Sequence, residues 1–461
     1  MMELERLAAV LGAAEVVGGE PVEVRDLVYD ARDATPGAAF FAVPGARVDG
    51  HDYAAQAVSN GAVALVVERS LSVGVPQLIV ADTRSSMAVA ADEFFGRPTE
   101  QLQVAGVTGT SGKTTTAFLL YAILAAAGRR PGLLGTVEAR VGGERRGVVR
   151  TTPEAIDLQR TFREMIDVGD RSCAMEASSH ASELHRLDRV RFSVLVFTNL
   201  SQDHLDFHGD MESYFRAKRR LFADGVPAVV NVADEYGRRL AAELPDAITF
   251  SGHDAAVLGD IDVKLRGRFN VENALGALFA ARALGIADDA IKRGIESVRG
   301  VPGRFETVDE GQPFTVIFDY AHKPDALEKV LRAARELARG RVIAVVGAGG
   351  DRDPGKRPLM GRIASELADV AIVTSDNPRS EDPLAIIDAI VAGATSGVDV
   401  EPDRAAAIGR AVEAAREGDV VVIAGKGAEQ GQQFADRTIP FDDRDAARNA
   451  LRSLAGQGAR T

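Results

Sequence analysis

From about residue 103 onward, short apolar runs alternate with segments of helical length. These runs lie at 102–105, 192–197, 314–318, 342–346, 370–374 and 420–424. Short, strongly apolar runs separated by helices are typical of parallel strands buried on both faces of a sheet. The pattern therefore predicts an α/β fold built on parallel sheets.

Two changes in this pattern divide the chain. Residues 1–102 combine alternating positions such as Val22-Glu23-Val24 with the apolar run 62–67, which predicts a small mixed α/β domain. The stretch 300–303 carries two glycines and a proline between a helical segment and a new series of strands. We therefore predict three domains, at 1–102, 103–300 and 301–461, the last with a Rossmann-like sheet.

The first segment is most strongly punctuated by turn residues between 29 and 51. A Pro-Gly turn, a short apolar strand and a second Pro-Gly turn predict a hairpin with solvated ends. This arrangement would leave Asp30, Arg32 and Asp49 on neighbouring loops. Spacing alone leaves open whether these side chains bind a ligand.

The glycine-rich stretch from Gly106 to Thr116 lies between an apolar run and a helical segment. A strand, a glycine-rich turn and Gly-Lys-Thr opening a helix are typical of sites that bind nucleotide phosphates. In such a site Lys113 would reach the terminal phosphates and the Thr114 hydroxyl would bind Mg²⁺. The spacing differs from the generic pattern, which has glycine where this chain has Val107. A glycine turn before a core helix is the alternative.

Polar side chains follow the predicted strands of the middle segment. Glu176 follows one apolar run, and Asp203 and His204 follow the run 192–197. Because α/β sheets bind ligands at the carboxyl ends of their strands, these groups are expected beside the phosphate loop, where they would suit Mg²⁺. The alternative is that each caps the next helix. Residues 214–222 predict an amphipathic helix, on which spacing alone makes Lys218 a solvated lysine.

Each apolar run of the last segment also ends in a polar cluster. The clusters lie at 319–322, 347–353, 375–379 and 425–429. They predict a second binding edge on a parallel sheet. The glycines at 347–350 are weak evidence for a dinucleotide site, because the Gly-x-Gly-x-x-Gly spacing is missing.

Composition narrows the classes of function. The net charge of −13 argues against a binder of nucleic acid or of membrane surfaces. The single cysteine, Cys173, excludes an intramolecular disulfide and a multi-thiolate metal site. No apolar stretch has the length of a transmembrane helix, and acidic residues at the start of the chain are unlike a signal peptide. We expect a cytoplasmic protein.

Several motifs together resemble one family. They are the loop 108–114, Met175-Glu176-Ala177-Ser178-Ser179-His180, the segment 198–206 and Asp319-Tyr320-Ala321-His322. The chain is similar to the Mur ligases, ATP-dependent amino-acid-adding enzymes of peptidoglycan precursor synthesis, over essentially its whole length. Within the family it most resembles the enzymes that add the third residue of the peptide.

The resemblance implies a central ATPase domain and a reaction through an acyl phosphate. The substrates would be UDP-N-acetylmuramoyl-L-alanyl-D-glutamate and meso-diaminopimelate, with ATP and two Mg²⁺ ions. Lys113, Lys218 and His204 would be catalytic, and Lys218 would carry CO₂ as a carbamate. Metal ligands would be Thr114, Glu176, His204 and Lys218.

The family's binding residues map onto three further sets of positions. ATP contacts would fall on Gly109, Thr110, Ser111, Gly112, Lys113, Thr114, Thr115, Asn273, Arg304, Asp319 and His322. The UDP-substrate would contact Ala31, Arg32, Thr151, Thr152, Ser178, Leu184, Arg186 and the loop Gly45-Ala46-Arg47. The diaminopimelate site would comprise Arg352, Asp376, Asn377, Pro378, Arg379, Gly425 and Glu429. Arg379 and Arg352 would each bind a carboxylate, unless Arg379 simply pairs with Glu381 or Asp382.

Four positions depart from the family pattern. Ala31 and Leu184 replace polar residues on the UDP-substrate side, and Ala348 and Ala428 replace a cysteine or serine and a histidine. They affect details of substrate contact and leave the phosphate chemistry unchanged. Three alternatives remain: lysine as the acceptor, a folylpolyglutamate synthetase, and a phosphate-loop protein that binds ATP as a switch. We expect small-molecule partners only, no membrane insertion, and a monomer.

Overall fold

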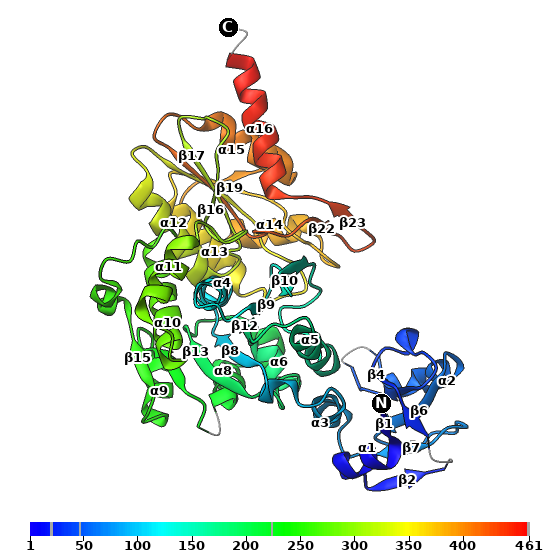
Figure 1. The fold of residues 1–461 in the computed structure, drawn as a ribbon. Coiled ribbons are helices and arrows are strands. Elements are labelled where there is room, and N and C mark those ends of the chain that lie inside the picture. The colour runs from blue at the N-terminus through cyan, green and yellow to red at the C-terminus, as the bar shows by residue number, and fades with distance from the viewer. Residues whose placement is uncertain (19–21, 46–47, 223–224, 459–461) are drawn as a thin grey trace. The chain divides into compact units, whose positions relative to one another are not determined.

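A computed structural model describes residues 1–18, 22–45, 48–222 and 225–458 (Figure 1). These residues form two compact units, of which the first comprises 1–108, 128–195 and 217–228 and the second 109–127, 196–216 and 229–461. The chain passes from one unit to the other within strand β13 (Phe192–Phe197), helix α8 (Met211–Arg219) and strand β14 (Ala228–Asn231), among other points. Ala46 and Arg47, predicted to contact the UDP-substrate, lie outside the described residues.

The first unit begins with a five-stranded sheet in the order β2-β7-β6-β5-β4. Its strands are β2 (Glu15–Val17), β7 (Gln77–Ile79), β6 (Ala62–Val67), β5 (Ala38–Phe41) and β4 (Asp26–Val28). All neighbouring pairs are parallel except β2 and β7. Apolar side chains are buried on both faces of the sheet, as the continuous run 62–67 predicts.

The hairpin predicted around β5 is wrong. β5 lies between β4 and β6 and is parallel to both, because the chain crosses over between these strands instead of turning back directly. Asp30 and Asp49 instead cap short 3-10 helices, η1 (Ala31–Asp33) and η2 (Gly50–Tyr53). In both cases the aspartate side chain accepts a backbone N–H two residues further on.

A second sheet of the first unit contains the strand that precedes the phosphate loop. β8 (Gln103–Thr108) and β9 (Pro131–Leu134) flank β12 (Ser172–Glu176) in parallel. β10 (Ala139–Val141) and β11 (Glu144–Arg146) extend the sheet by antiparallel pairing. The other elements that lie within this unit are β1 (Met2–Glu3), α1 (Leu4–Leu11), β3 (Glu23–Val24), α2 (Ala54–Ser59), α3 (Thr83–Phe94), η3 (Pro98–Glu100), α5 (Ala155–Asp167), α6 (Ser179–Glu183) and η4 (Arg220–Phe222).

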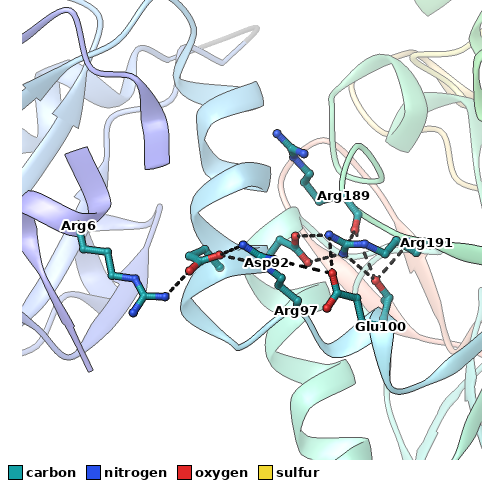
Figure 2. Close-up of polar contacts among 8 residues, drawn as sticks. Arg6, Asp92, Arg97, Glu100, Arg189 and Arg191 are labelled. Carbon is teal, nitrogen blue, oxygen red and sulfur yellow. Dashed lines mark hydrogen bonds and ion pairs between the residues drawn. The ribbon is translucent and has the colours of Figure 1, made fainter. Parts of the chain in front are cut away.

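An ion-pair network joins α3 to the segment before β13 within the first unit (Figure 2). Arg191 donates to both carboxylate oxygens of the buried Asp92, at 2.9 and 3.1 Å, and lies 3.3 Å from Glu100. Arg6 pairs with Glu93, the next residue of α3. Because Asp92 is largely desolvated, its bidentate pair is expected to contribute more than the exposed pairs around it.

The second unit contains a six-stranded sheet in the order β16-β17-β21-β18-β19-β20. Its strands are β16 (Glu306–Val308), β17 (Thr315–Asp319), β21 (Val420–Ala424), β18 (Val342–Val346), β19 (Val370–Val373) and β20 (Asp399–Val400). Only β16 is antiparallel to its neighbour. The carboxyl ends of β17, β21, β18 and β19 therefore meet at one edge, which confirms the predicted gathering of polar clusters.

Helices cover both faces of this sheet, and the strand residues alternate between two cores. Val342, Ala344 and Val346 pack with α12 (Pro324–Leu337), α13 (Lys356–Leu367) and α14 (Pro383–Val391). Ile343 and Val345 pack with α15 (Arg404–Ala414) and α16 (Asp443–Gly458). The α/β class predicted from the apolar runs is confirmed.

A group of helices in the second unit packs on the helix that follows the phosphate loop (Figure 1). α4 (Lys113–Ala126) contacts α10 (Arg268–Ala283) and α11 (Asp288–Ser297). A Cβ on Gly294 would lie 2.4 Å from the Ile123 Cα, so α11 and α4 approach closely because this residue is glycine. The remaining elements are α7 (Leu205–His208), α8 (Met211–Arg219), α9 (Glu235–Glu243), β15 (Ile248–Phe250), η5 (Gly252–Leu258), β22 (Gly431–Gln433) and β23 (Thr438–Pro440). Over the part of the chain that the structure describes, no helix is long and apolar enough to span a membrane.

Candidate active site

The glycine-rich segment predicted to bind phosphates forms a tight loop between β8 and α4. Gly109 and Gly112 have φ angles of +144° and +88°. A Cβ on Gly109 would lie 1.9 Å from the Thr198 hydroxyl oxygen, and a Cβ on Gly112 would lie 2.4 Å from Asn273 Oδ1. Only glycine fits at either position. Val107, where the sequence departs from the generic phosphate loop, is fully buried in β8.

The two residues that follow β13 hold the loop backbone in place. The Ser111 N–H donates to Asn199 Oδ1 at 2.9 Å, and the Thr198 hydroxyl donates to the Ser111 carbonyl at 2.6 Å. The Thr110 N–H donates to the Asn199 carbonyl at 2.9 Å. The predicted Thr198-Asn199 motif thus stabilises the backbone conformation of the loop. Thr115, also predicted to contact ATP, is buried in the first turn of α4.

Two lysine side chains meet at one backbone carbonyl of the loop. Lys113 Nζ donates to the Thr110 carbonyl oxygen at 3.1 Å, and Lys323 Nζ donates to the same oxygen at 3.2 Å. Asp203 Oδ2 lies 2.7 Å from Lys323 Nζ and 2.8 Å from His204 Nε2. We call Lys113, Asp203, His204 and Lys323 the loop cluster. The structure thus brings Asp203 and His204 to the loop, as their position after a strand predicts.

Burial and charge fix the protonation states of the loop cluster. Burial by itself raises the pKa of Asp203, but Lys323 and His204 outweigh it and hold that pKa well below its ordinary value. Burial lowers the pKa of His204, and it lowers the pKa of the nearby His322 much further. His322 Nδ1 lies 2.7 Å from the Tyr320 carbonyl oxygen. At neutral pH both imidazoles are neutral, and Asp203 is the negative group among them.

Arg304 connects the phosphate loop to the end of β17. One Nη2–H of Arg304 donates to the Thr114 hydroxyl at 2.9 Å, and its guanidinium lies over the Tyr320 ring, 4.4 Å from the ring centroid. Asp319 accepts the Phe305 N–H at 2.6 Å. Burial raises the pKa of Asp319 to about 6. Arg304, expected to contact the nucleotide, therefore also positions the hydroxyl expected to bind the metal.

Asn273 is engaged with its own surroundings. Its Oδ1 accepts a hydrogen bond from the Thr116 hydroxyl at 3.4 Å, and its Nδ2 donates to Asn270 Oδ1 at 2.9 Å. Because the same Oδ1 lies beside Gly112, the Asn273 side chain packs against the phosphate loop. A contact between Asn273 and adenine stays a prediction.

A second group of polar side chains lies at the carboxyl ends of β19 and β21. Lys426 Nζ, fully buried, donates to Asn377 Oδ1 at 2.8 Å and lies 3.4 Å from Glu429 Oε2. Asn377 Nδ2 donates to the same Glu429 oxygen at 2.8 Å. Asp376 Oδ1 lies 3.9 Å from Lys426 Nζ, and no described group hydrogen-bonds to Asp376 Oδ2. We call Asp376, Asn377, Lys426 and Glu429 the C-terminal cluster.

Gly425 has a φ of +125°, and a Cβ there would lie 2.4 Å from Asp376 Oδ2. The missing side chain at position 425 therefore keeps the space beside that carboxylate open. Pro378 is buried and leads to Arg379, whose φ of 52° lies in the left-handed region. The structure thus brings the predicted residues from Asp376 to Arg379 and from Gly425 to Glu429 to one place.

The side chain of Arg379 points to the glycine-rich segment after β18. Its Nη1 donates to the Gly350 carbonyl at 2.5 Å, and burial lowers its pKa. Glu381, the alternative partner, instead pairs with Arg357 at 2.8 Å. Arg352 is exposed and donates to the Asp351 carbonyl. The alternative in which Arg379 pairs with Glu381 is therefore wrong.

A fully buried ion pair lies behind the C-terminal cluster. Arg404 donates through Nε and Nη2 to the two carboxylate oxygens of Asp443, both at 2.7 Å. Its Nη2 also donates to the Ala424 carbonyl at 3.1 Å, immediately before Gly425. This pair therefore anchors the start of the segment 425–429. Both side chains are 0% exposed, and the sequence analysis missed both.

In the first unit, the residues predicted for the UDP-substrate form one hydrogen-bonded network. The Thr152 hydroxyl donates to the Glu176 carbonyl at 2.8 Å and accepts the Ser178 N–H at 3.2 Å. Arg186 donates to the Thr152 carbonyl at 3.1 Å and pairs with Glu154 at 2.8 Å. The Ser178 side chain also caps α6, accepting the Ala181 N–H at 3.2 Å.

The carboxylate of Glu176 belongs to the same network. Its Oε1 accepts the Thr136 N–H at 2.7 Å, and the Thr136 hydroxyl lies 3.0 Å from the Thr151 hydroxyl. A pocket of about 200 Å³ lies beside these groups, and Gly135, Thr151 and Asp157 help to line it. This pocket gives the first unit a cavity at the predicted substrate residues.

Three other predicted substrate residues lie apart from this network. Ala31 is buried at the start of η1, and Arg32 is exposed and pairs with Asp30. Leu184 ends α6 as its C-cap residue. Their contact with the UDP-substrate stays a prediction.

Lys218 lies on α8 and is only 1% exposed, so the solvated lysine expected from spacing alone is wrong. Among the residues that the structure describes, no three His, Cys, Asp or Glu side chains gather as a metal site. A magnesium ion would therefore depend partly on other oxygen donors, of which the Thr114 hydroxyl in the second unit is one. Such oxygen ligands fit the chemistry of Mg²⁺.

Three comparisons with known proteins agree. The model described as "Mur ligase family, catalytic domain" matches residues 23–95, "Mur ligase middle domain" matches 107–261, and "Mur ligase, glutamate ligase domain" matches 303–427. The UDP-N-acetylmuramoyl-L-alanyl-D-glutamate–2,6-diaminopimelate ligase of Solibacter usitatus is 47% identical, over 93% of this chain and 94% of the relative. The ligase of the same name from Streptomyces coelicolor is 45% identical, over 98% and 97%.

A solved structure of a UDP-N-acetylmuramoyl-L-alanyl-D-glutamate–2,6-diaminopimelate ligase is also similar. It superposes with a TM-score of 0.62 at 30% identity, covering 94% of this chain and 95% of that chain. The likeness therefore extends over the full length in both sequence and fold. The chain belongs to the Mur ligase family, as its motifs predict.

Proposed function

We propose that this chain is an ATP-dependent ligase that joins meso-2,6-diaminopimelate to UDP-N-acetylmuramoyl-L-alanyl-D-glutamate. The observation that carries the proposal is full-length identity of 45–47% to relatives named for that reaction. The C-terminal cluster supports it, because Asp376 and Glu429 present carboxylates suited to an amino group. Arg379 and Arg352 lie nearby as carboxylate partners for the second acidic group of the acceptor.

The reaction proceeds in two balanced steps. A side-chain carboxylate oxygen of the D-glutamyl residue attacks the γ-phosphorus of ATP, the bond to the bridging oxygen breaks, and ADP leaves. The acceptor amine then attacks the acyl carbon, the carbon–oxygen bond to phosphate breaks, and phosphate and a proton are released. Lys113 offsets the negative charge of the phosphates in the first step.

The metal and the modified lysine form part of this proposal. As the resemblance implies, Thr114, Glu176, His204 and carbamylated Lys218 would hold Mg²⁺, which would supply positive charge at the phosphates. CO₂ would add to the neutral amine of Lys218, forming a nitrogen–carbon bond and releasing a proton. His204 would position Asp203 through its Nε2 contact. The division at 102/103 and 300/301, the cytoplasmic location and the monomeric state stay predictions.

Phosphate release from ATP tests the function directly. The assay uses UDP-N-acetylmuramoyl-L-alanyl-D-glutamate with meso-diaminopimelate, L-lysine, L-glutamate and no amine in parallel. We expect turnover with meso-diaminopimelate at least tenfold faster than with lysine. Equal or faster turnover with lysine would overturn the acceptor specificity. No turnover with any amine would overturn the ligase function and favour the ATP switch.

A further inference from the structure

Tyr320 stands in the polar segment that ends β17, and the function proposed above gives it no role. Its neighbours Asp319 and His322 are predicted to contact ATP. Tyr320 lies in the second unit and is half-buried. A tyrosine can pack on one group with its ring and bind another with its hydroxyl. The contacts at the two ends of this side chain therefore define what it does.

The ring of Tyr320 packs on a guanidinium that reaches the phosphate loop. The Arg304 guanidinium carbon lies 4.4 Å from the ring centroid, and Arg304 Nη2 donates to the Thr114 hydroxyl at 2.9 Å. The His322 ring meets the Tyr320 ring edge to face, with 4.5 Å between the centroids. A cation over the face of an aromatic ring is stabilised, whereas a free arginine side chain samples many rotamers. The Tyr320 ring thus favours the arginine conformer that reaches Thr114.

The hydroxyl of Tyr320 belongs to the C-terminal cluster. Burial raises the pKa of Tyr320, and the carboxylates of Glu429 and Asp376 raise it further, so the O–H remains a donor at neutral pH. Glu429 acts on this hydroxyl through its charge and also through a hydrogen bond. Tyr320 is in turn among the groups that act on Arg379. The hydroxyl therefore lies with the side chains expected to bind the acceptor.

Close backbone packing joins Tyr320 to the loop that follows β21. The Tyr320 N–H donates to the Gly303 carbonyl at 3.0 Å. A Cβ on Gly427 would lie 2.8 Å from the same carbonyl oxygen and 2.9 Å from the Tyr320 Cβ, and a Cβ on Gly303 would lie 2.2 Å from the Ala428 nitrogen. No side chain fits between these segments. Because Arg304 directly follows Gly303, the loop after β21 packs against the backbone that carries both Arg304 and Tyr320.

We infer that Tyr320 is a positioning residue for both sites, whose ring holds Arg304 at the Thr114 hydroxyl and whose hydroxyl holds Glu429 at the acceptor site. The inference deepens the proposed function and rests on it for the identity of the acceptor, whereas the contact between Arg304 and Thr114 requires only a nucleotide at the loop. Tyr320 forms no covalent bond and transfers no proton in either step. Since the two contacts use separate parts of one side chain, substitutions can remove them one at a time.

Two substitutions separate the hydroxyl from the ring. Tyr320→Phe removes only the hydroxyl, and we expect KM for meso-diaminopimelate to rise about fivefold, with the affinity for AMP-PNP and Mg²⁺ within twofold of wild type. Tyr320→Leu also removes the ring and should weaken AMP-PNP binding about fivefold in calorimetric titration. Tyr236→Phe is the matched control, because it removes a hydroxyl from α9, where the Tyr236 ring packs on Phe215 with 5.4 Å between the centroids. It should leave both quantities within twofold.

A double-mutant cycle tests whether the ring acts through Arg304. Arg304→Met should by itself weaken AMP-PNP binding about tenfold. Adding Tyr320→Leu should then change the affinity less than twofold, because the side chain that the ring positions is already missing. Tyr320→Met replaces Tyr320→Leu in the cycle if the leucine variant does not fold. Additive losses would overturn the inference, as would equal weakening of AMP-PNP binding by Tyr320→Phe and Tyr320→Leu, which a merely structural role would produce.

The titrations keep the inference separate from the proposed function. If wild type releases no phosphate with any amine, the ligase function fails, while the AMP-PNP cycle still decides whether Tyr320 acts through Arg304. If wild type turns over with meso-diaminopimelate and Tyr320→Phe leaves KM for this acceptor within twofold, the ligase function stands. The hydroxyl then has no part in the acceptor site, and the inference is overturned.

Discussion

The loop cluster and the C-terminal cluster lie in the same unit and have opposite charge deficits. At the loop, Lys113 and Lys323 share a carbonyl, and Asp203 offsets only part of their charge. At the C-terminal cluster, Lys426 faces Asp376 and Glu429, and one oxygen of Asp376 has no described hydrogen-bond partner. We therefore expect the first cluster to bind an anion and the second a cation. That difference matches a phosphate at one and an amino group at the other.

The two clusters also differ in how the fold supports them. The loop is shaped by glycines that no other residue can replace, at positions 109 and 112. The C-terminal cluster is supported by a long-range pair, Arg404 with Asp443, joined to the Ala424 carbonyl. A local motif therefore defines the phosphate side, and tertiary contacts define the acceptor side. The predictions below use this contrast.

The largest effect is expected for Lys113→Met at the loop cluster. Removing the ammonium that faces the phosphates should lower kcat about 10³-fold or more, because it acts on charge in the transition state. The rate of phosphate release at saturating concentrations of all substrates measures kcat for the variant and for wild type. Lys329→Met, which removes an exposed charge, is the control. A fall of less than tenfold would contradict the role given to Lys113.

The second effect concerns the stability of the protein and the buried ion pair between Arg404 and Asp443, which lies behind the C-terminal cluster. Arg404→Met leaves the carboxylate of Asp443 buried without its partner and should lower the free energy of unfolding by about 3–5 kcal/mol. The double variant Arg404→Met with Asp443→Leu should recover much of that loss, since it leaves no buried charge. Urea unfolding of the three proteins measures both. If the single and double variants are equally destabilised, the pair acts through packing and not through charge.

The contrast also explains how much of the site could be predicted from the sequence. The loop residues are contiguous, so their spacing alone indicates a phosphate site. The β17–β21 edge was predictable because each apolar run ends in polar residues. Arg404 and Asp443 carry no local signal, since they lie 39 residues apart and each begins an ordinary helix. Only the tertiary fold reveals that they are fully buried.

Lys323 was missed for a related reason. It directly follows the motif Asp319–His322 and is the N-cap residue of α12. A lysine at the start of a helix is usually solvated, so its residue type gives no reason to expect burial. The hairpin error at β5 has the same origin, because turn residues do not distinguish a hairpin from a crossover.

A smaller effect is expected for Arg379→Ala on the acceptor side. Loss of a charge-assisted contact to a carboxylate should raise KM for meso-diaminopimelate about 10- to 100-fold, corresponding to about 1.5–3 kcal/mol. KM for ATP should change less than threefold, because Arg379 donates to Gly350 and is not part of the loop cluster. Steady-state kinetics with each substrate varied in turn separate the two. Equal changes in both KM values would contradict the assignment of Arg379 to the acceptor.

The smallest effect concerns Asp319, which ends β17 and whose carbonyl accepts the Gly425 N–H. Burial raises its pKa to about 6 from an ordinary value of 3.8, so the folded protein binds more protons than the unfolded chain between these values. The free energy of unfolding should therefore fall as pH rises from about 4 to 6. We expect the opposite trend for nucleotide binding. If the charged carboxylate contacts the nucleotide, KM for ATP should rise several-fold as pH falls through 6, while KM for meso-diaminopimelate should not. Asp319→Asn should make KM for ATP independent of pH in that window, and a persisting rise would assign the titration to a different group.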